Sequence, residues 1–116
     1  MKFPITIVAT LLTIVPMAAA AQSDPRSGTE IFEQMCAGCH GTRGDGGDGH
    51  KGGFSPVIST LSNKEYMDQV PDEYLVLVIK KGGAYMGKIS AMPAWETRLS
   101  DDDIRRVVAH IRTFTR

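Results

Sequence analysis

The sequence predicts a small all-α domain, because helix-start signals recur along the chain and no run of alternating polar and apolar residues indicates a sheet. The starts are serines followed within three residues by acidic side chains, at Ser27, Ser62 and Ser100. Glycine-rich segments separate the helical stretches. With 116 residues, 42% of them hydrophobic, the chain has the size and composition of one globular domain.

The first half of the chain is expected to contain two helices joined by a long loop. A helix over residues 27–37 begins with a capping box between Ser27 and Glu30 and continues with apolar residues at helical spacing. Residues 41–53 are dominated by glycine, which predicts a loop. A second capping box then opens a short helix over residues 62–69.

The second half is expected to contain two longer helices. The apolar run 74–79 has the composition of a buried strand, but Pro71 and acidic residues precede it, and two lysines and two glycines follow it. These flanks predict a helix. Residues 84–99 are expected to be irregular, and Ser100 to cap the last helix, where three aspartates complement the helix dipole.

The beginning of the chain has the composition of a secretory signal peptide. A positive start that includes Lys2 precedes the predominantly apolar residues 5–15 and a run of four alanines that ends at residue 21. We expect residues 1–21 to be a signal peptide and residues 22–116 to be the exported domain, in a bacterial periplasm. The alternative is that the signal is retained as a membrane anchor. If the signal is cleaved, no stable membrane span is expected in the remaining chain.

Charge excludes one class of partner. The chain has thirteen basic and thirteen acidic residues, and loss of Lys2 with the signal leaves the domain close to neutral. A domain of this charge is not expected to bind nucleic acid.

Both cysteines of the chain lie in one pentapeptide, Cys36-Ala37-Gly38-Cys39-His40. Residues three apart on a helical turn share a face, so two thioethers from Cys36 and Cys39 can reach one porphyrin. His40 then lies next to the metal, and its imidazole is a common axial ligand of haem iron. The motif predicts covalent attachment of one haem c.

Three other readings of the motif fit less well. A redox dithiol is expected after a strand in a βαβ pattern, which is absent from this sequence. A disulfide leaves the histidine in register unexplained. A tetrahedral zinc site needs convergence of the motif with a remote histidine, His50 or His110, at spacings that fit no familiar zinc finger.

With these motifs the chain resembles a class I c-type cytochrome, monohaem and His/Met-ligated, over nearly its whole length beyond the signal. The resemblance depends on four features: Gly28, Phe32 and Cys36 at four-residue steps; the pentapeptide 36–40; Met92-Pro93-Ala94-Trp95; and residues 99–104. It implies a small all-α cytochrome c-like fold wrapped around one covalent haem. The first and last helices of that fold cross near glycine and aromatic positions.

The sixth ligand of the iron is expected to be a methionine. Met92 is favoured, because Pro93 biases it out of helical geometry and because Met-Pro matches the distal-ligand signature of the family. Met86 also lies in an irregular stretch and is the alternative. Met67 is predicted to pack in a short helix.

Two further haem contacts are implied by the resemblance. Pro56 matches the proline that follows the glycine-rich loop, whose carbonyl accepts the proton of the other ring nitrogen of His40. Trp95 matches an aromatic residue near the haem, where it is able to bond a propionate; simple packing in the core is the alternative. His50 is expected to be solvated, and His110 to pack between the terminal helices.

The expected function is one-electron transfer in the periplasm between protein partners of unknown identity, without enzymatic activity. Four lysines are a candidate positive rim for docking an acidic partner, or simply solvated side chains: Lys51, Lys80, Lys81 and Lys88. Two alternatives remain open. In the first, the chain is the cytochrome subunit of a larger dehydrogenase or oxidase. In the second, it is a haem enzyme or sensor whose iron has an open sixth position.

Overall fold

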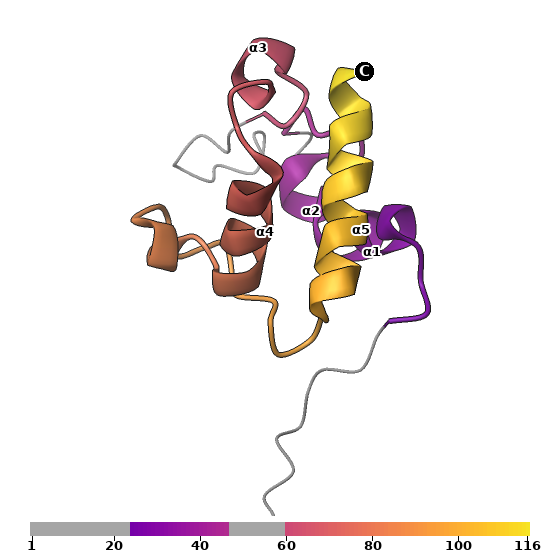
Figure 1. Ribbon diagram of the computed structural model, residues 1–116, viewed down its shortest axis with the longest axis vertical. Helices are drawn as coiled ribbons and strands as arrows, with labels where there is room; N and C mark the ends of the chain where they lie inside the picture. Colours follow the sequence, from indigo (N-terminus) through magenta and orange to yellow (C-terminus); the bar gives the residue numbers. More distant parts are fainter. Residues whose placement is uncertain (1–23, 47–59) are drawn as a thin grey trace, which may run out of the picture.

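The computed structural model describes residues 24–46 and 60–116 (Figure 1). Their elements, in chain order, are the α-helices α1 (Gly28–Met35), α2 (Ala37–His40), α3 (Lys64–Met67), α4 (Asp72–Lys81) and α5 (Asp101–Ile111), with the 3-10 helices η2 (Ala84–Met86) and η3 (Arg112–Thr115). No strand occurs in these two segments, so the all-α prediction is confirmed for them. The expected signal peptide and residues 47–59 of the glycine-rich loop lie outside the described residues.

Helix α1 begins where the sequence predicts and ends earlier. The Ser27 side chain accepts the N–H of Glu30, and the Glu30 carboxylate accepts the N–H of Ser27 in return. The prediction of one helix to residue 37 is wrong, because the backbone of Cys36 turns to φ −117° and divides α1 from α2. Nothing in the local sequence marks this stop, since Cys36 and Ala37 carry neither a glycine nor a proline signal.

Helix α3 is one residue out of register with its prediction. Its N-cap is Asn63, whose Oδ1 accepts the N–H of Tyr66 at 3.0 Å, and not Ser62. Asparagine and serine cap helices about equally well, so two adjacent candidates leave the register undetermined by sequence.

The run 74–79 forms helix α4 as predicted. Pro71 is the N-cap, acidic residues occupy the first turn and Lys80 and Lys81 the last. The helix ends at Gly82, whose φ of +83° is readily available only to glycine. Figure 1 shows α4 and α5 side by side, with α1 crossing behind α5.

The core is formed where α1, α4 and α5 meet. Its buried side chains are Ile31 and Phe32 of α1, Leu75, Val78 and Ile79 of α4, Ile104, Val107, Val108 and Ile111 of α5, together with Met67 and Leu99. Met67 therefore packs in the core, as the sequence predicts.

The crossing of α1 and α5 depends on a glycine. A Cβ atom at Gly28 would lie 2.1 Å from the carbonyl oxygen of Arg106, well inside contact distance. His110 packs beside the crossing, with its ring centroid 5.1 Å from that of Phe32 and 5.0 Å from that of Phe114. Its Nδ1 is 3.0 Å from the hydroxyl of Thr29. The expectation that His110 packs between the terminal helices is confirmed.

Helix α5 also carries a buried carboxylate. Asp103 closes a capping box with Ser100, and it also accepts the backbone N–H of Asp24 at 3.0 Å and the guanidinium of Arg106 at 2.6 Å. Burial alone would raise the pKa of Asp103, but the hydrogen bonds from Ser100 and Asp24 and the charge of Arg106 hold it below its ordinary value. All three aspartates lie in the first turn of α5, as the dipole interpretation expects, but Asp103 is also fully buried, which the sequence did not indicate.

We expect Gly28→Ala to destabilise the protein by about 2 kcal/mol, because overpacking at the crossing outweighs the gain in helix propensity. Thermal unfolding followed by circular dichroism should show a midpoint lower by roughly 10 °C. Gly38→Ala is the matched control, since no neighbouring atom lies within 4 Å of a Cβ atom there. Equal midpoints for Gly28→Ala and the parent would show that the crossing tolerates a side chain.

We expect Asp103→Asn to cost about 2 kcal/mol at pH 7, because buried donors lose a charged acceptor. The pKa values of Asp103 and Asp24 are both lowered, that of Asp24 to about 2, chiefly by hydrogen bonds from Arg26 to Asp24. Carboxylates with lowered pKa values stabilise the fold fully above the unfolded pKa of about 3.9 and lose this contribution in stronger acid. The difference from the parent should therefore shrink below about pH 4 in denaturant titrations. Asp102→Asn, at an exposed position of the same helical turn, is the control and should cost much less than Asp103→Asn at pH 7.

Candidate haem site

One helical turn carries the three residues of the attachment motif. Cys36 ends α1, and the N–H groups of Cys39 and His40 donate to the carbonyl of Cys36 at 3.1 and 3.0 Å. Both cysteines are free thiols; Cys36 is half-buried and Cys39 is exposed. The break at residue 36 thus gives the motif a short helix of its own, α2, and the predicted helical turn is present.

The two thiols have different surroundings. Burial, and to a lesser degree the neighbouring Cys39, raises the pKa of Cys36 to about 11. Cys36 is therefore protonated at neutral pH in the folded chain and is a poor nucleophile there.

The side chain of His40 is in a state that allows it to bind a metal. Its Nδ1 is buried and has no hydrogen-bond partner among the described residues. Burial lowers the pKa of His40, which keeps the imidazole neutral at pH 7. The neutral form has the lone pair that a metal requires. An unpartnered buried imidazole nitrogen beside two free thiols fits a covalently attached haem.

Met92 lies in a segment that is fixed to the end of α4. Its carbonyl accepts the N–H of Gly83 at 2.9 Å, and the N–H of Trp95 donates to Ile79 at 3.1 Å. The approach requires the two glycines that follow α4. A Cβ atom at Gly82 would lie 3.0 Å from the Met92 carbonyl oxygen, and one at Gly83 would lie 2.1 Å from that of Ile89. The side chain of Met92 is half-buried at the edge of the core.

Met86 lies in the adjoining 3-10 helix η2. Its N–H donates to the carbonyl of Gly83 at 3.0 Å, while the N–H of Gly83 donates to Met92, so both candidate methionines bond to one residue at the end of α4. Met86 is half-buried like Met92, whereas the side chain of Met67 is only 1% exposed within the core. The structure thus brings two of the three candidates to one end of α4.

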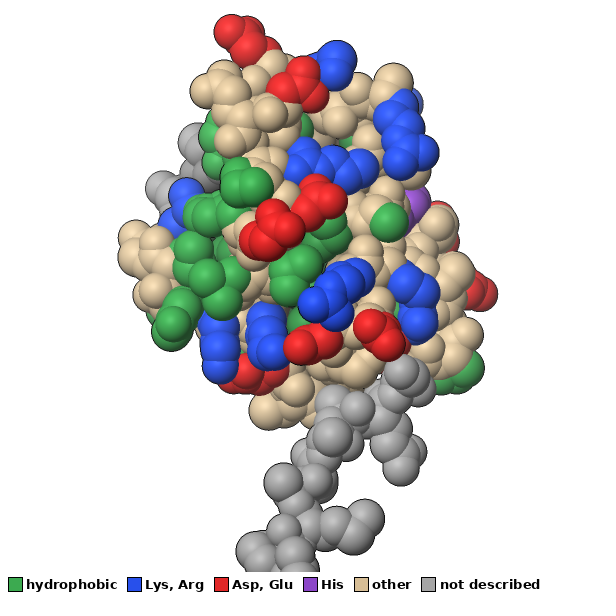
Figure 2. Space-filling model, viewed as in Figure 1, with side chains coloured by type: hydrophobic (Ala, Val, Ile, Leu, Met, Phe, Trp, Pro, Cys, Tyr) green, Lys and Arg blue, Asp and Glu red, His purple; other side chains and the backbone are tan. Residues whose placement is uncertain are grey.

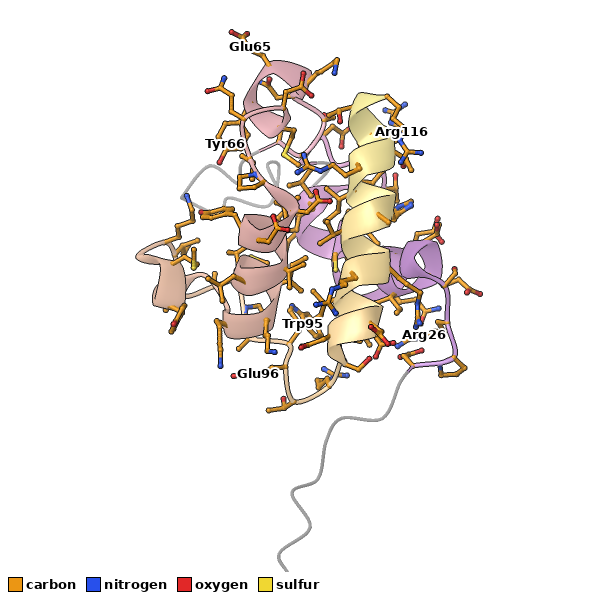
Figure 3. The ribbon with its side chains drawn as sticks, viewed as in Figure 1. Arg26, Glu65, Tyr66, Trp95, Glu96 and Arg116 are labelled. Atoms are coloured by element: carbon orange, nitrogen blue, oxygen red, sulfur yellow. The ribbon has the colours of Figure 1, made fainter. Side chains whose placement is uncertain are left out.

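Trp95 lies between the C-terminal end of α4 and the start of α5 (Figure 3). Its ring is half-buried against the core, and the guanidinium of Arg98 lies 5.5 Å from the ring centroid. Sequence reasoning missed this arginine, although the spacing Trp-x-x-Arg over a turn was available as a signal. Pro56 and His50 lie outside the described residues.

The expected positive rim is largely neutralised. Lys80 pairs with Asp101 and Lys81 with Glu96, each at 2.7 Å, and the hydrogen bond that Lys81 donates to Glu96 raises the pKa of Lys81. Lys88 is exposed. Lys51 lies outside the described residues. Within residues 24–46 and 60–116, no group of three or more His, Cys, Asp or Glu side chains is arranged to hold a metal ion.

The fold and the motif define a monohaem c-type cytochrome of class I. Residues 23–111 match the family model described as cytochrome C oxidase, cbb3-type, subunit III, and the chain belongs to this family of c-type cytochromes. The Cys36 and Cys39 pair is consistent with its haem c site.

Curated relatives of the chain include two cytochromes c6. The cytochrome c6 of Bryopsis maxima is 34% identical over 90 residues, which cover 76% of this chain and 89% of that protein. The chloroplastic cytochrome c6 of Chlamydomonas reinhardtii is 26% identical over 92% of this chain, and the match spans only 66% of the Chlamydomonas protein. These relatives support the expectation of an electron carrier and not an enzyme.

A solved structure has the same fold. The KustC0563 c-type cytochrome superposes with a TM-score of 0.63 at 22% identity, over 78% of this chain and all of that one. This likeness confirms the expected small helical cytochrome c fold.

Proposed function

We propose that residues 22–116 form a diffusible one-electron carrier in which Cys36 and Cys39 hold one haem c and His40 and Met92 are the axial ligands of its iron. The observation that carries the proposal is the buried, neutral and unpartnered imidazole of His40 beside two free thiols. When bound, the haem supplies an iron that alternates between the ferrous and ferric states.

The chain's own residues set the properties of that iron. The thioether sulfur of Met92 is a soft ligand that favours ferrous iron and so raises the reduction potential. The backbone bonds from Gly83 to Met92 and from Trp95 to Ile79 hold the methionine segment in place. A ligand held in this way moves little when the charge of the iron changes, which favours fast electron transfer.

Two further residues, Pro56 and Trp95, are assigned contacts with the ligand or the haem. The Nδ1 of His40 needs an acceptor, and the carbonyl of Pro56 is the acceptor that the family resemblance assigns. Trp95 lies beside the methionine segment and is assigned a place near the haem by the same resemblance.

Export suits the chemistry of attachment. The raised pKa of Cys36 makes its thiol unreactive in the folded chain, so thioether formation is expected before folding is complete. Residues 1–21 are assigned as the signal that takes the chain to the periplasm, where protein donors and acceptors of electrons are its partners. Among the described residues, no helix has the length and apolar character needed to cross a bilayer.

A second role is favoured by one observation. The matching family model is that of an oxidase subunit, so the chain is alternatively the cytochrome subunit of a larger complex. A subunit of this kind copurifies with its complex from the native membrane or periplasm, whereas a diffusible carrier elutes alone.

We expect Met92→Ala to open the sixth position, lower the reduction potential by on the order of 100 mV or more and allow carbon monoxide to bind the ferrous protein. Spectroelectrochemistry and carbon monoxide difference spectra of the haem-loaded protein measure these changes. Met86→Ala is the matched control and should keep the parent potential. Carbon monoxide binding in Met86→Ala, with an unchanged spectrum in Met92→Ala, would assign the ligand to Met86.

A further inference from the structure

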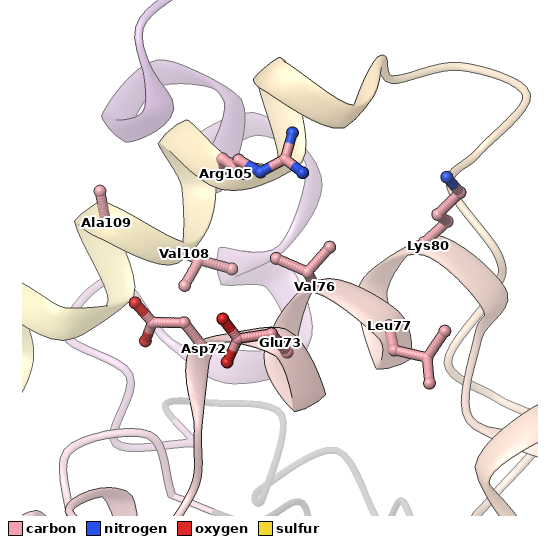
Figure 4. Close-up of a pocket in the computed structure, with 8 residues that line it drawn as sticks. All are labelled: Asp72, Glu73, Val76, Leu77, Lys80, Arg105, Val108 and Ala109. Atoms are coloured by element: carbon pink, nitrogen blue, oxygen red, sulfur yellow. The ribbon is translucent and has the colours of Figure 1, made fainter.

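A groove between α4 and α5 has no part in the haem site. Eight residues line it: Asp72, Glu73, Val76, Leu77, Lys80, Arg105, Val108 and Ala109 (Figure 4). Its volume is about 550 Å³. Neither the attachment motif nor the Met92 segment contributes a lining residue, so a partner seated here leaves both free.

Helix α4 carries more apolar surface than the core uses. Of its apolar run, Leu75, Val78 and Ile79 are buried, whereas Leu77 is 37% exposed and Val76 is half-buried in the groove. Figure 2 shows hydrophobic side chains gathered over α4 on this face, with charged side chains around them. A fully solvated helix face is expected to be polar at such positions, so this face is suited to a contact.

Two opposite charges lie on the two helices that flank the groove, Glu73 on α4 and Arg105 on α5, with Val76 between them (Figure 4). The carboxylate of Glu73 has no ion pair or hydrogen bond among the described residues, whereas its neighbour Asp72 pairs with Arg112 at 2.7 Å. Arg105 has only a 3.6 Å contact with Asp102, in which both side chains are mostly exposed. Each helix therefore has one charge that is available for a partner.

We propose that this groove is the contact between two copies of the chain, related by a two-fold axis near Val76. A two-fold rotation about this axis exchanges the α4 and α5 sides of the groove, so Glu73 of each copy meets Arg105 of the other. The apolar residues Val76 and Leu77 of the two copies then cover one another.

Charge complementarity favours a second copy over an unrelated partner. The same surface supplies an acidic side chain on one side of the proposed axis and a basic one on the other. Without Lys2 the domain has thirteen acidic and twelve basic residues, so two copies repel little at long range. Eight lining residues are fewer than the roughly 20–30 per side of a standard interface, so the dimer is weak and forms at high concentration.

Sedimentation equilibrium of the haem-loaded protein at low salt, from about 10 µM to about 1 mM, measures the association. The mass should rise from monomer towards dimer across the series. Glu73→Lys and Arg105→Glu each place like charges opposite one another at both contacts and should weaken the dimer about tenfold or more. Glu33→Lys, on the exposed face of α1, is the matched control and should associate like the parent.

Restoration is the decisive part of the experiment. An equal mixture of Glu73→Lys and Arg105→Glu chains, or the double variant alone, recreates both opposite-charge pairs and should recover the parent association. A monomer at every concentration, association that neither single variant weakens, or failure of both restorations overturns the proposal. Binding of a different protein to the groove by a chain that stays monomeric would also overturn it.

The visible spectrum separates this proposal from the one on haem ligation. All of these variants should keep the parent spectrum and reduction potential, because the groove does not include His40 or Met92. A dimer that fails to form leaves the ligation unaffected, and an error in ligation leaves the association unaffected.

Discussion

The close approach of Gly28 to the carbonyl of Arg106, which leaves no room for a Cβ atom, is the constraint on which the rest of the structure depends. This contact fixes the angle at which α1 crosses α5. Because Cys36 is the C-cap of α1, the same contact determines where Cys36 lies. The Phe32, His110 and Phe114 rings fill the space beside the contact. Replacing the glycine therefore affects the position of the attachment motif through the helix and not through any direct contact with it.

A second close approach serves the other half of the site. The pair Gly82-Gly83 allows the Met92 carbonyl to reach the end of α4, and Trp95 adds its own bonds to the carbonyls of Ile79 and Lys80. Helices α1 and α4 both pack on α5 around one core. The segments that contain His40 and Met92 are therefore fixed relative to each other. In the proposed site, both ligand segments would therefore be held in place by the same core.

Features that depend on local chemistry were predictable from the sequence. Neighbouring residues were enough to predict the helical turn at the pentapeptide ending at His40, the cap at Ser100 and the helical nature of α4. Long-range partners were not predictable, because Asp24 and Asp103 are 79 residues apart and each resembles an ordinary surface aspartate. The choice between Met86 and Met92 depends on family resemblance, since the structure holds both at one residue, Gly83.

The most direct test of the account is an NMR spectrum of the reduced, haem-loaded protein with labelled methionine methyl groups. Four methionines follow the expected signal, at positions 35, 67, 86 and 92. We predict that one methyl signal, from Met92, is strongly displaced by the ring current of the porphyrin, while that of Met86 stays in the ordinary range. A displaced Met86 signal, or no displaced methionine at all, would contradict the assignment of Met92 as the sixth ligand.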